Sequence, residues 1–401
     1  MTQTAISALA RDAFHLPEGV TYLDGNSLGP MPLAAQDRLA RMMRDEWGQM
    51  LVTGWNRAGW FDQPGRVGDR VAALIGAGPG QVVMGDTLSV KLFQAVSAAR
   101  ALRPDRRVIL SDNGNFPSDL YVAQGLADAV GADLRVVAPD AVGEAISRIG
   151  DDLAVLMLTE VDYRTGRRHD MADLTARAHL AGALAVWDLA HSAGAVDLDV
   201  TGAGADFAVG CTYKYLNGGP GAPAFIWTHP RHADTARPIL QGWMGHDAPF
   251  AFDPDYRPAR GIERMRVGTP PVIAMTVLDE ALKLWEGVSL ADLRARSIRL
   301  TEAFIKGVEA ECPELVLHSP RDPARRGSQV GFLHPHGNAV MQALIAHGVI
   351  GDFRAPDVLR FGFAPLYNDA DDVERAVQQL ARILRDGIWQ RDEFQRRAAV
   401  T

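Results

Sequence analysis

Apolar and amphipathic segments alternate along the chain from residue 67 to about 230. Seven short runs are apolar enough to be buried strands: 81–84, 107–111, 134–138, 153–158, 184–188, 206–210 and 222–227. Helical patterns separate them, beginning near Thr87, near Pro117 and at Asp170, where Asp173 has the spacing of a capping box. Apolar strands separated by helices predict an α/β fold with a mostly parallel sheet covered on both faces.

The pattern changes after residue 230. Residues 231–270 are irregular, and the remainder predicts a smaller α+β unit. Helices are expected over 271–287, from Ser289 to about residue 311, over 338–347 and after Asn368; strands are expected over 315–318, 329–333 and near 358–363. We therefore divide the chain into an N-terminal segment (1–50), a large α/β domain (51–270) and a small C-terminal α+β domain (271–401).

The N-terminal segment carries a helix-like pattern over residues 33–50, followed by a loop-like stretch at 51–66. That stretch holds Trp55 and Trp60. Two exposed tryptophans would be unusual, so the stretch either lines a site or meets a partner chain, or its tryptophans pack locally.

Composition and net charge exclude several classes of function. The chain has 401 residues, of which 47% are hydrophobic and 22% charged, as in ordinary soluble enzymes. The net charge of −8 argues against nucleic acid as a partner. With only Cys211 and Cys312 there is no disulfide framework or C-x-x-C zinc pattern. Neither a signal peptide nor a membrane-length apolar run is evident, so we expect a cytoplasmic protein.

Two polar residues that follow apolar strands suggest chemistry. Lys214 lies between the strand at 206–210 and a glycine-rich turn, where a neutral amine could attack a carbonyl. Asp188 ends the strand at 184–188, with His191 just beyond, and could hold a protonated ring nitrogen. Alternatively, Lys214 extends its charged end to solvent at the rim of the strand, and Asp188 caps the next turn. The order of aspartate and lysine favours pyridoxal 5′-phosphate.

Other turns could complete such a site. The turn at residues 85–89 lies between a strand and a helix and could bind phosphate or simply cap the helix. Phe116, at the next such turn, could cover a flat ring or belong to the core. Arg354 and Arg360 lie in the small unit, and the buried Arg360 could bind a substrate carboxylate or form a structural ion pair. His334 and His336 lack a carboxylate at metal-ligand spacing, so we expect them to be solvated.

The chain resembles kynureninase, a fold-type-I pyridoxal phosphate enzyme of the aminotransferase class V type, over nearly its whole length. The matching motifs are YLDGNSLG (22–29), FPSD (116–119), WDLAHSAG (187–194), DFAVGCTYKYLN (206–217), GWMGH (242–246) and RFGFAPLYN (360–368). The resemblance implies hydrolysis of L-kynurenine to anthranilate and L-alanine in tryptophan catabolism.

The resemblance also implies residue roles. Lys214 would bind the cofactor as a Schiff base and shuttle the substrate's Cα proton, and Tyr213 would protonate the carbanion left by bond cleavage. Asp188 would hold the pyridine nitrogen, with Phe116 and His191 beside the ring. The remaining cofactor pocket would comprise Leu88, Ser89, Pro117, Ser118, Asp119, Thr159, Trp243 and Thr269. Arg360 would bind the substrate carboxylate, and Asn26 and Ser27 would lie near the substrate.

A homodimer is expected, with the active site at the subunit interface and Thr269 supplied by the partner, together with Trp243. Some relatives have asparagine where Thr269 stands, which favours L-kynurenine over 3-hydroxykynurenine here. Alternatives are a kynureninase that prefers the hydroxylated substrate, or a cysteine desulfurase, which would need a mobile nucleophilic cysteine. A further alternative is a non-catalytic nucleotide-binding or scaffold protein on a doubly wound sheet, in which the pairing of Asp188 with Lys214 would be a coincidence.

Overall fold

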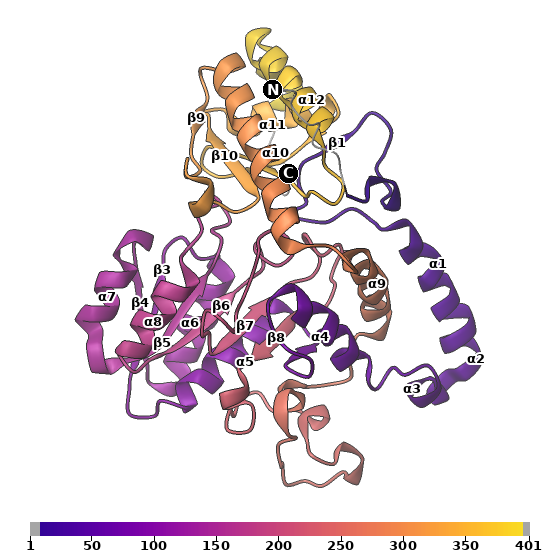
Figure 1. Cartoon of the computed structure of the whole chain (residues 1–401), viewed down its shortest axis with the longest axis vertical. Coiled ribbons are helices and arrows are strands. Elements are labelled where there is room, and N and C mark those ends of the chain that lie inside the picture. The colour runs from indigo at the N-terminus through magenta and orange to yellow at the C-terminus, as the bar shows by residue number, and fades with distance from the viewer. Residues whose placement is uncertain (1–8, 396–401) are drawn as a thin grey trace.

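The seven apolar runs form one seven-stranded sheet in the computed structural model, which describes residues 9–395 (Figure 1). In chain order the strands are β2 (Val82–Met84), β3 (Val108–Asp112), β4 (Asp133–Val137), β5 (Leu153–Thr159), β6 (Leu184–Asp188), β7 (Phe207–Gly210) and β8 (Phe225–Thr228). Their spatial order is β2-β8-β7-β6-β5-β3-β4. Only β8 runs antiparallel to its neighbours, so the predicted α/β class with a mostly parallel sheet is confirmed.

Helices cover both faces of this sheet except at the edge strand β4, which is largely exposed. The helices are α4 (Gln63–Leu74), α5 (Leu88–Ala101), α6 (Pro117–Val130), α7 (Val142–Ile149), α8 (Met171–Leu180) and α9 (Val272–Leu282). Successive residues of β5 enter different cores: Leu156 packs in one, and Val155 and Met157 pack in the other. Side chains alternate across a strand, so a strand covered on both sides must be apolar at every position.

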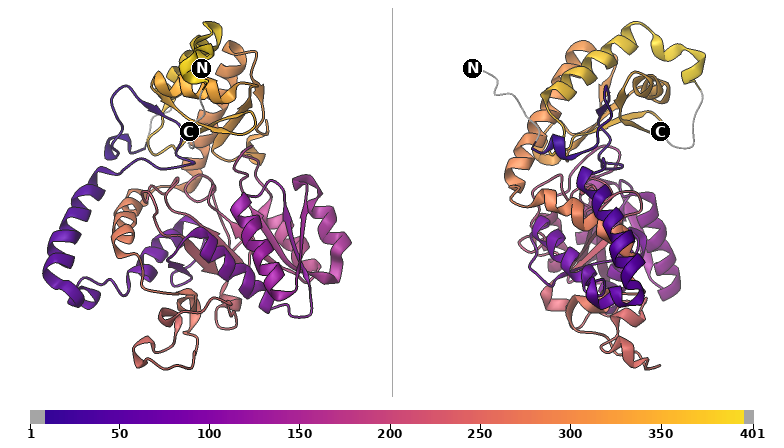
Figure 2. Two further views of the ribbon diagram at one scale, coloured as in Figure 1. Left: turned by 180° about the vertical axis from the view of Figure 1, so that it is seen from behind. Right: turned by 90° about the vertical axis from the view of Figure 1, so that its right-hand side faces the viewer.

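The smaller unit sits on one end of the larger one (Figure 2). Its helices are α10 (Leu290–Glu311), α11 (Gly337–Ala346) and α12 (Ala370–Arg385), and its sheet has the antiparallel order β12-β13-β10-β9. These strands are β9 (Val316–Leu317), β10 (Gln329–Leu333), β12 (Asp352–Arg354) and β13 (Val358–Gly362). A separate pair joins β1 (Thr21–Tyr22) to β11 (Val349–Ile350). The chain's N-terminal segment thereby enters the smaller unit.

Side-chain caps fix several helix starts. Ser289 Oγ accepts from the backbone of Asp292 at the start of α10, as predicted. Asp170 Oδ1 likewise accepts from Asp173 N at 3.0 Å. These local signals explain why the observed starts of α8 and α10 agree with the sequence.

Packing places α9 with the larger unit. Met275, Leu278 and Leu282 belong to the core beneath the large sheet, whereas the core of the smaller unit begins at Leu300 within α10. The division at residue 270 remains a prediction, and this packing favours a boundary inside α10.

The N-terminal segment forms a helical arm along the edge of the larger unit (Figure 1). It comprises α1 (Leu33–Arg41), a π-helical segment (Met42–Trp47), α2 (Gly48–Met50) and α3 (Gly54–Arg57), and α4 begins at Gln63. The prediction of a loop over 51–66 was therefore wrong, because short helices occupy much of it. Trp60 is buried, donates to Glu46 Oε2 at 3.0 Å and meets Trp55 edge to face, so these tryptophans pack locally.

The prediction that His334 is solvated was wrong. His334 is buried, and Trp389 packs edge to face against it. His336 is exposed and stacks on the same indole at 4.8 Å between ring centroids. Across residues 9–395, no helix is long and apolar enough to cross a membrane.

Candidate active site

A cavity of about 370 Å³ lies at the carboxyl ends of β5, β6 and β7 and extends to the smaller unit. Twelve of the predicted site residues line it: Asn26, Ser27, Leu88, Ser89, Phe116, Ser118, Thr159, Asp188, His191, Tyr213, Lys214 and Arg360. Parallel strands bring their carboxyl ends to one edge of a sheet, so residues distant in sequence converge there.

A larger cleft of about 920 Å³ lies among α7, α8 and the loop at 197–203, and its lining includes Arg167 and Arg168. Arg167 pairs with Asp140, and Arg168 pairs with Glu160, both at 2.8 Å. Because its cations are already neutralised and its lining carries none of the predicted chemistry, we assign the site to the smaller cavity.

The amine of Lys214 faces the imidazole of His191. Lys214 Nζ lies 2.9 Å from His191 Nε2, and His191 Nδ1 lies 2.9 Å from Gln329 Oε1. Burial, followed by the charges of Lys214 and Arg360, holds the pKa of His191 well below its usual value. His191 is therefore a neutral ring that accepts from the lysine.

Asp188 and Asp119 form a buried carboxyl pair near Lys214. One oxygen of Asp188 accepts from the backbone of Ala190 at 2.8 Å, so it caps that turn and still faces the cavity. Both oxygens of Asp119 are buried without a hydrogen-bond partner. Burial and then the neighbouring Asp188 raise the pKa of Asp119, and burial also raises that of Asp188. Such a pair favours a ligand that brings positive charge or donors.

The predicted phosphate turn lies at the start of α5, which runs from Leu88 to Ala101. Thr87 and Ser89 line the cavity, and the side chain of Thr87 does not cap the helix. A helix N-terminus offers free N–H groups and a positive dipole end, which suit a phosphate. The turn is held from behind by the buried Lys91, whose Nζ lies 3.3 Å from Asp86 and 2.8 Å from the carbonyl of Met265.

One aromatic wall of the cavity consists of Phe116 and Tyr163, whose rings meet edge to face at 5.0 Å. Phe116 is 42% exposed, so it is not the core residue of the alternative reading. It precedes α6, where Pro117 takes the first helical position; Pro117 itself does not line the cavity. Tyr163 was missed from the sequence.

Tyr213 adjoins Lys214, and its ring centroid lies 5.7 Å from the ammonium. Burial, then the neighbouring Cys211, raises the pKa of Tyr213 above its usual value, so its phenol keeps its proton at neutral pH. The backbone of Gly29 donates to the Tyr213 carbonyl at 2.8 Å. A Cβ at Gly29 would lie 2.4 Å from the carbonyl of Lys214, so only glycine allows the N-terminal segment this close.

Arg360 is buried and already paired. Its Nε donates to Asp352 Oδ1 at 2.7 Å, its Nη2 donates to Ser27 Oγ at 2.9 Å, and its Nη1 donates to the Tyr163 carbonyl. Arg354, which also lines the cavity, lies 2.7 Å from Asp352. The site therefore holds two arginines around one aspartate; the structural ion pair of Arg360 is observed, and its binding of a substrate carboxylate stays a prediction.

Asn26 lies in the same region, fully buried, and neither its amide nitrogen nor its oxygen has a hydrogen-bond partner. Buried polar groups are normally hydrogen-bonded, so an unpartnered amide lining a cavity fits a ligand contact.

Four predicted residues do not line this cavity: Pro117 and Asp119, which adjoin it, and Trp243 and Thr269, which lie elsewhere. Trp243 is 41% exposed and packs against Phe250 in the irregular segment 231–270, which projects from the end of the larger unit opposite the smaller one (Figure 1). Thr269 lies beside Asp86 and Lys91, behind the phosphate turn.

The residues present fit pyridoxal phosphate. A lysine amine, a buried carboxyl pair with two unpartnered oxygens, a helix start and an aromatic wall surround one cavity. These groups match the cofactor's aldehyde, ring nitrogen, phosphate and ring face respectively.

Solved structures share this fold. A cysteine desulfurase from Thermococcus onnurineus aligns with a TM-score of 0.77 and 20% identity, over 94% of this chain and 98% of that one. The cysteine desulfurase CsdA from Escherichia coli aligns with a TM-score of 0.77 and 20% identity, over 94% of this chain and 97% of that one. At this identity the likeness shows the fold alone.

Relatives found by sequence have a much higher identity to this chain than these solved structures do. A kynureninase from Pseudomonas fluorescens is 50% identical over 399 residues, covering 98% of this chain and 95% of that protein. A kynureninase from Burkholderia pseudomallei (strain K96243) is 49% identical over 397 residues with the same coverage. The family model for the kynureninase C-terminal domain matches residues 293–380. On this similarity over almost its entire length, the chain belongs to the kynureninase family.

Proposed function

We propose that this protein hydrolyses L-kynurenine to anthranilate and L-alanine with pyridoxal phosphate as cofactor. The observation that carries the proposal is the meeting of Lys214, the Asp119–Asp188 pair and the Arg360–Asp352–Arg354 cluster around one cavity. The first two suit the cofactor, and the cluster suits the carboxylate of an amino acid.

Each cofactor group has candidate partners. Asp188 and Asp119 would hold the ring nitrogen and a ring donor, Phe116 and His191 would flank the ring, and Lys214 would bind covalently. Thr159 lies beside Asp188, and Leu88, Ser89 and Ser118 lie at the two helix starts that face the cavity. When bound, the cofactor supplies an electron sink for the substrate's Cα.

This chain's own residues supply binding and proton transfer. Arg360, with Arg354, Asn26 and Ser27, would orient the substrate's α-carboxylate. The amine of Lys214 would carry the proton of Cα. The phenol of Tyr213 holds a proton that it can give to Cβ once the bond to the carbonyl carbon has broken. Water supplies the oxygen that ends on anthranilate, so the atoms balance.

Homodimerisation would complete the site in this proposal. Exposed apolar residues are concentrated on the N-terminal arm and the irregular segment: Met43, Trp47, Leu51, Val52, Trp243, Phe250 and Phe252. Such surfaces support an interface between subunits. Trp243 and Thr269 would then reach the partner's cavity, and Thr269 favours L-kynurenine over its 3-hydroxy form. The two cysteines are free and buried, which suits the cytoplasm.

The test is an assay of purified protein loaded with cofactor. We expect anthranilate fluorescence from L-kynurenine, slower turnover of 3-hydroxykynurenine, and a mass by light scattering of two chains. Lys214→Ala should abolish both turnover and the visible absorbance of the bound cofactor. Lys306→Ala, which removes an exposed lysine of α10, serves as the matched control. A colourless protein without turnover after cofactor addition would refute the proposal.

A cysteine desulfurase is disfavoured because that reaction needs a mobile nucleophilic cysteine. Cys211 and Cys312, the only cysteines of the chain, are both buried, and burial raises the pKa of each thiol. Release of sulfide from L-cysteine at a rate comparable to kynurenine turnover would reverse this judgement.

A further inference from the structure

Gln329, the first residue of β10, extends from the smaller unit to His191 at the cavity of the larger one. Its Oε1 lies 2.9 Å from His191 Nδ1. Its Nε2 donates to the carbonyls of Asp162 and Tyr163 at 2.9 and 3.0 Å. Its whole polar end is thus engaged, and the residue is buried.

The two carbonyls fix which end of the amide faces His191. A carbonyl oxygen only accepts, so the atom of Gln329 between Asp162 and Tyr163 must be the NH₂ group. The opposite orientation would set the amide oxygen against two other oxygens, with no donor among them. The amide oxygen is therefore the atom that meets His191.

An acceptor at Nδ1 decides the protonation of the imidazole. Nδ1 must carry a hydrogen to bond to Gln329 Oε1, and the buried ring is neutral, so Nε2 carries a lone pair. That lone pair is 2.9 Å from Lys214 Nζ, an amine that has hydrogens to donate. The other tautomer would point an N–H at the ammonium.

We propose that Gln329 is a positioning residue that holds His191 as its Nδ1–H tautomer and so presents a lone pair to the amine of Lys214. The inference rests on the proposed function only for its consequence in catalysis, because the hydrogen-bond chain itself needs no cofactor. Gln329 does not itself line the cavity and makes no hydrogen bond to Lys214, so it acts through His191.

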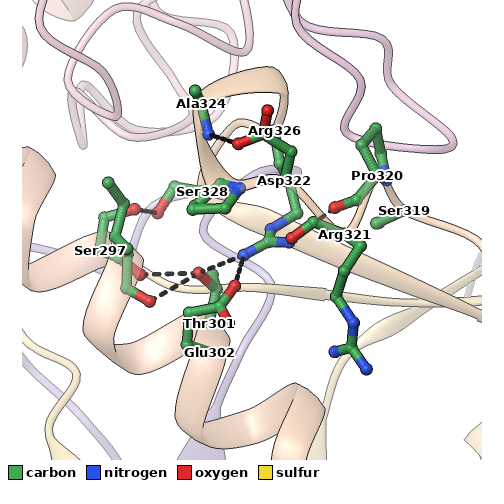
Figure 3. Close-up of polar contacts among 12 residues, drawn as sticks. Ser297, Thr301, Glu302, Ser319, Pro320, Arg321, Asp322, Ala324, Arg326 and Ser328 are labelled. Atoms are coloured by element: carbon green, nitrogen blue, oxygen red, sulfur yellow. Dashed lines mark hydrogen bonds and ion pairs between the residues drawn. The ribbon is translucent and has the colours of Figure 1, made fainter.

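The backbone just before Gln329 is anchored firmly enough to serve this role. Arg326 is buried and donates to the carbonyls of Pro320 and Arg321 and to Glu302 of α10 (Figure 3). Ser328 accepts from Ser297 of α10 at 2.7 Å, as the close-up also shows (Figure 3). These bonds tie the start of β10 to α10.

The same network of hydrogen bonds also connects His191 with Arg360. The Tyr163 carbonyl accepts from both Gln329 Nε2 and Arg360 Nη1. The residue that sets the tautomer and the residue expected to bind the substrate carboxylate therefore share one acceptor. A shift of the smaller unit would move both.

The test compares Gln329→Leu with Gln329→Glu. Leucine has a similar size but cannot accept, so His191 loses the partner that selects its tautomer. Glutamate keeps an acceptor for Nδ1–H while losing the donors to the two carbonyls. Gln378→Leu, on the exposed face of α12, is the control for replacing a glutamine by leucine.

The decisive readout uses cofactor-free protein with heavy-nitrogen-labelled histidines. Long-range proton–nitrogen correlation spectra distinguish the two tautomers, and His191→Asn identifies the signals of His191. We expect Nδ1–H in the wild type, in Gln329→Glu and in Gln378→Leu, and Nε2–H or a mixture in Gln329→Leu. Wild-type signals in Gln329→Leu would overturn the proposal, even if the protein is an active kynurenine hydrolase.

A second readout uses the loaded enzyme. One lost hydrogen bond to a site residue corresponds to about a tenfold change. We expect Gln329→Leu to weaken cofactor affinity and to lower kcat about tenfold, with KM changed less than twofold, and Gln329→Glu to recover part of kcat. A fall in Tm alone, with cofactor affinity and kcat unchanged, would show a merely structural role and also overturn the proposal.

Discussion

Asp352 and Arg360 stand directly opposite each other on the paired strands β12 and β13 and form a buried ion pair. Nε of Arg360 donates to Oδ1 of Asp352 at 2.7 Å. The guanidinium is thus held in one orientation at the cavity before any substrate arrives. Arg354 contacts the same carboxylate and brings a second positive charge.

Replacing either arginine by methionine should separate their contributions. Arg360→Met leaves Asp352 buried without its main partner, so we expect a loss of about 3 kcal/mol of unfolding free energy and a KM about 100-fold higher. Arg354 is partly exposed, so Arg354→Met should raise KM about tenfold with little loss of stability. Urea unfolding and steady-state kinetics measure these effects. Equal KM values for Arg354→Met and wild type would remove Arg354 from substrate binding.

Asp24 gives substrate binding a pH dependence. Burial, then the charge of Asp352, raises the pKa of Asp24 to about 7, and its Oδ1 is buried without a partner. As pH rises through about 7, Asp24 gains a negative charge beside the arginine cluster expected to bind the substrate's α-carboxylate, so KM should rise. Asp24→Asn should flatten this part of the KM profile. A profile unchanged by Asp24→Asn would show that another group titrates.

Tyr213→Phe tests the proton donor. The raised pKa of Tyr213 keeps its phenol protonated, and the variant removes the oxygen while keeping the ring beside Lys214. We expect the bound cofactor to keep its visible absorbance and kcat to fall by about 100-fold or more. Tyr121→Phe, on the exposed surface of α6, is the control. Unchanged kcat in Tyr213→Phe would exclude Tyr213 from proton transfer.

Asp206 should make stability depend on pH. Its buried carboxylate binds His179, His232 and Arg231 at 2.6 to 2.8 Å, and these bonds, together with the backbone of Ala185, outweigh burial and hold its pKa well below the usual value. A lowered folded-state pKa stabilises the protein above the unfolded pKa of about 3.9, and this contribution is lost as pH falls through the folded value.

Asp206→Asn should therefore lower the unfolding free energy by about 3 kcal/mol at neutral pH, and the difference from wild type should shrink in acid. Asp173→Asn, which removes an exposed pair with Arg177, should cost less than about 0.5 kcal/mol at any pH. Urea titrations over a pH series measure both. A wild-type advantage that grows on acidification would contradict this assignment.

The predictions that the structure confirms are those that depend on residues close together in the sequence. The central apolar runs, such as those that became β5, β6 and β7, must be apolar throughout because helices cover the sheet on both faces there, whereas the edge strand β4 is largely exposed and carries Asp133 and Arg135. Ser289 and Asp170 mark helix starts because a cap bonds to a backbone group only a few residues away. The loop predicted at 51–66 failed because helices shorter than two turns carry too little periodicity to detect.

Sequence alone also determined the pairing of Asp188 with Lys214, because each follows a strand whose carboxyl end must lie at the same edge of a parallel sheet. Only the tertiary structure decided the partners of these groups. Gln329 meets His191 across 138 residues, and Asp119 lies against Asp188 without a local signal. Such contacts depend on where separate strands and helices end after packing. A backbone carbonyl such as that of Tyr163, which every residue type possesses, leaves no trace in the sequence.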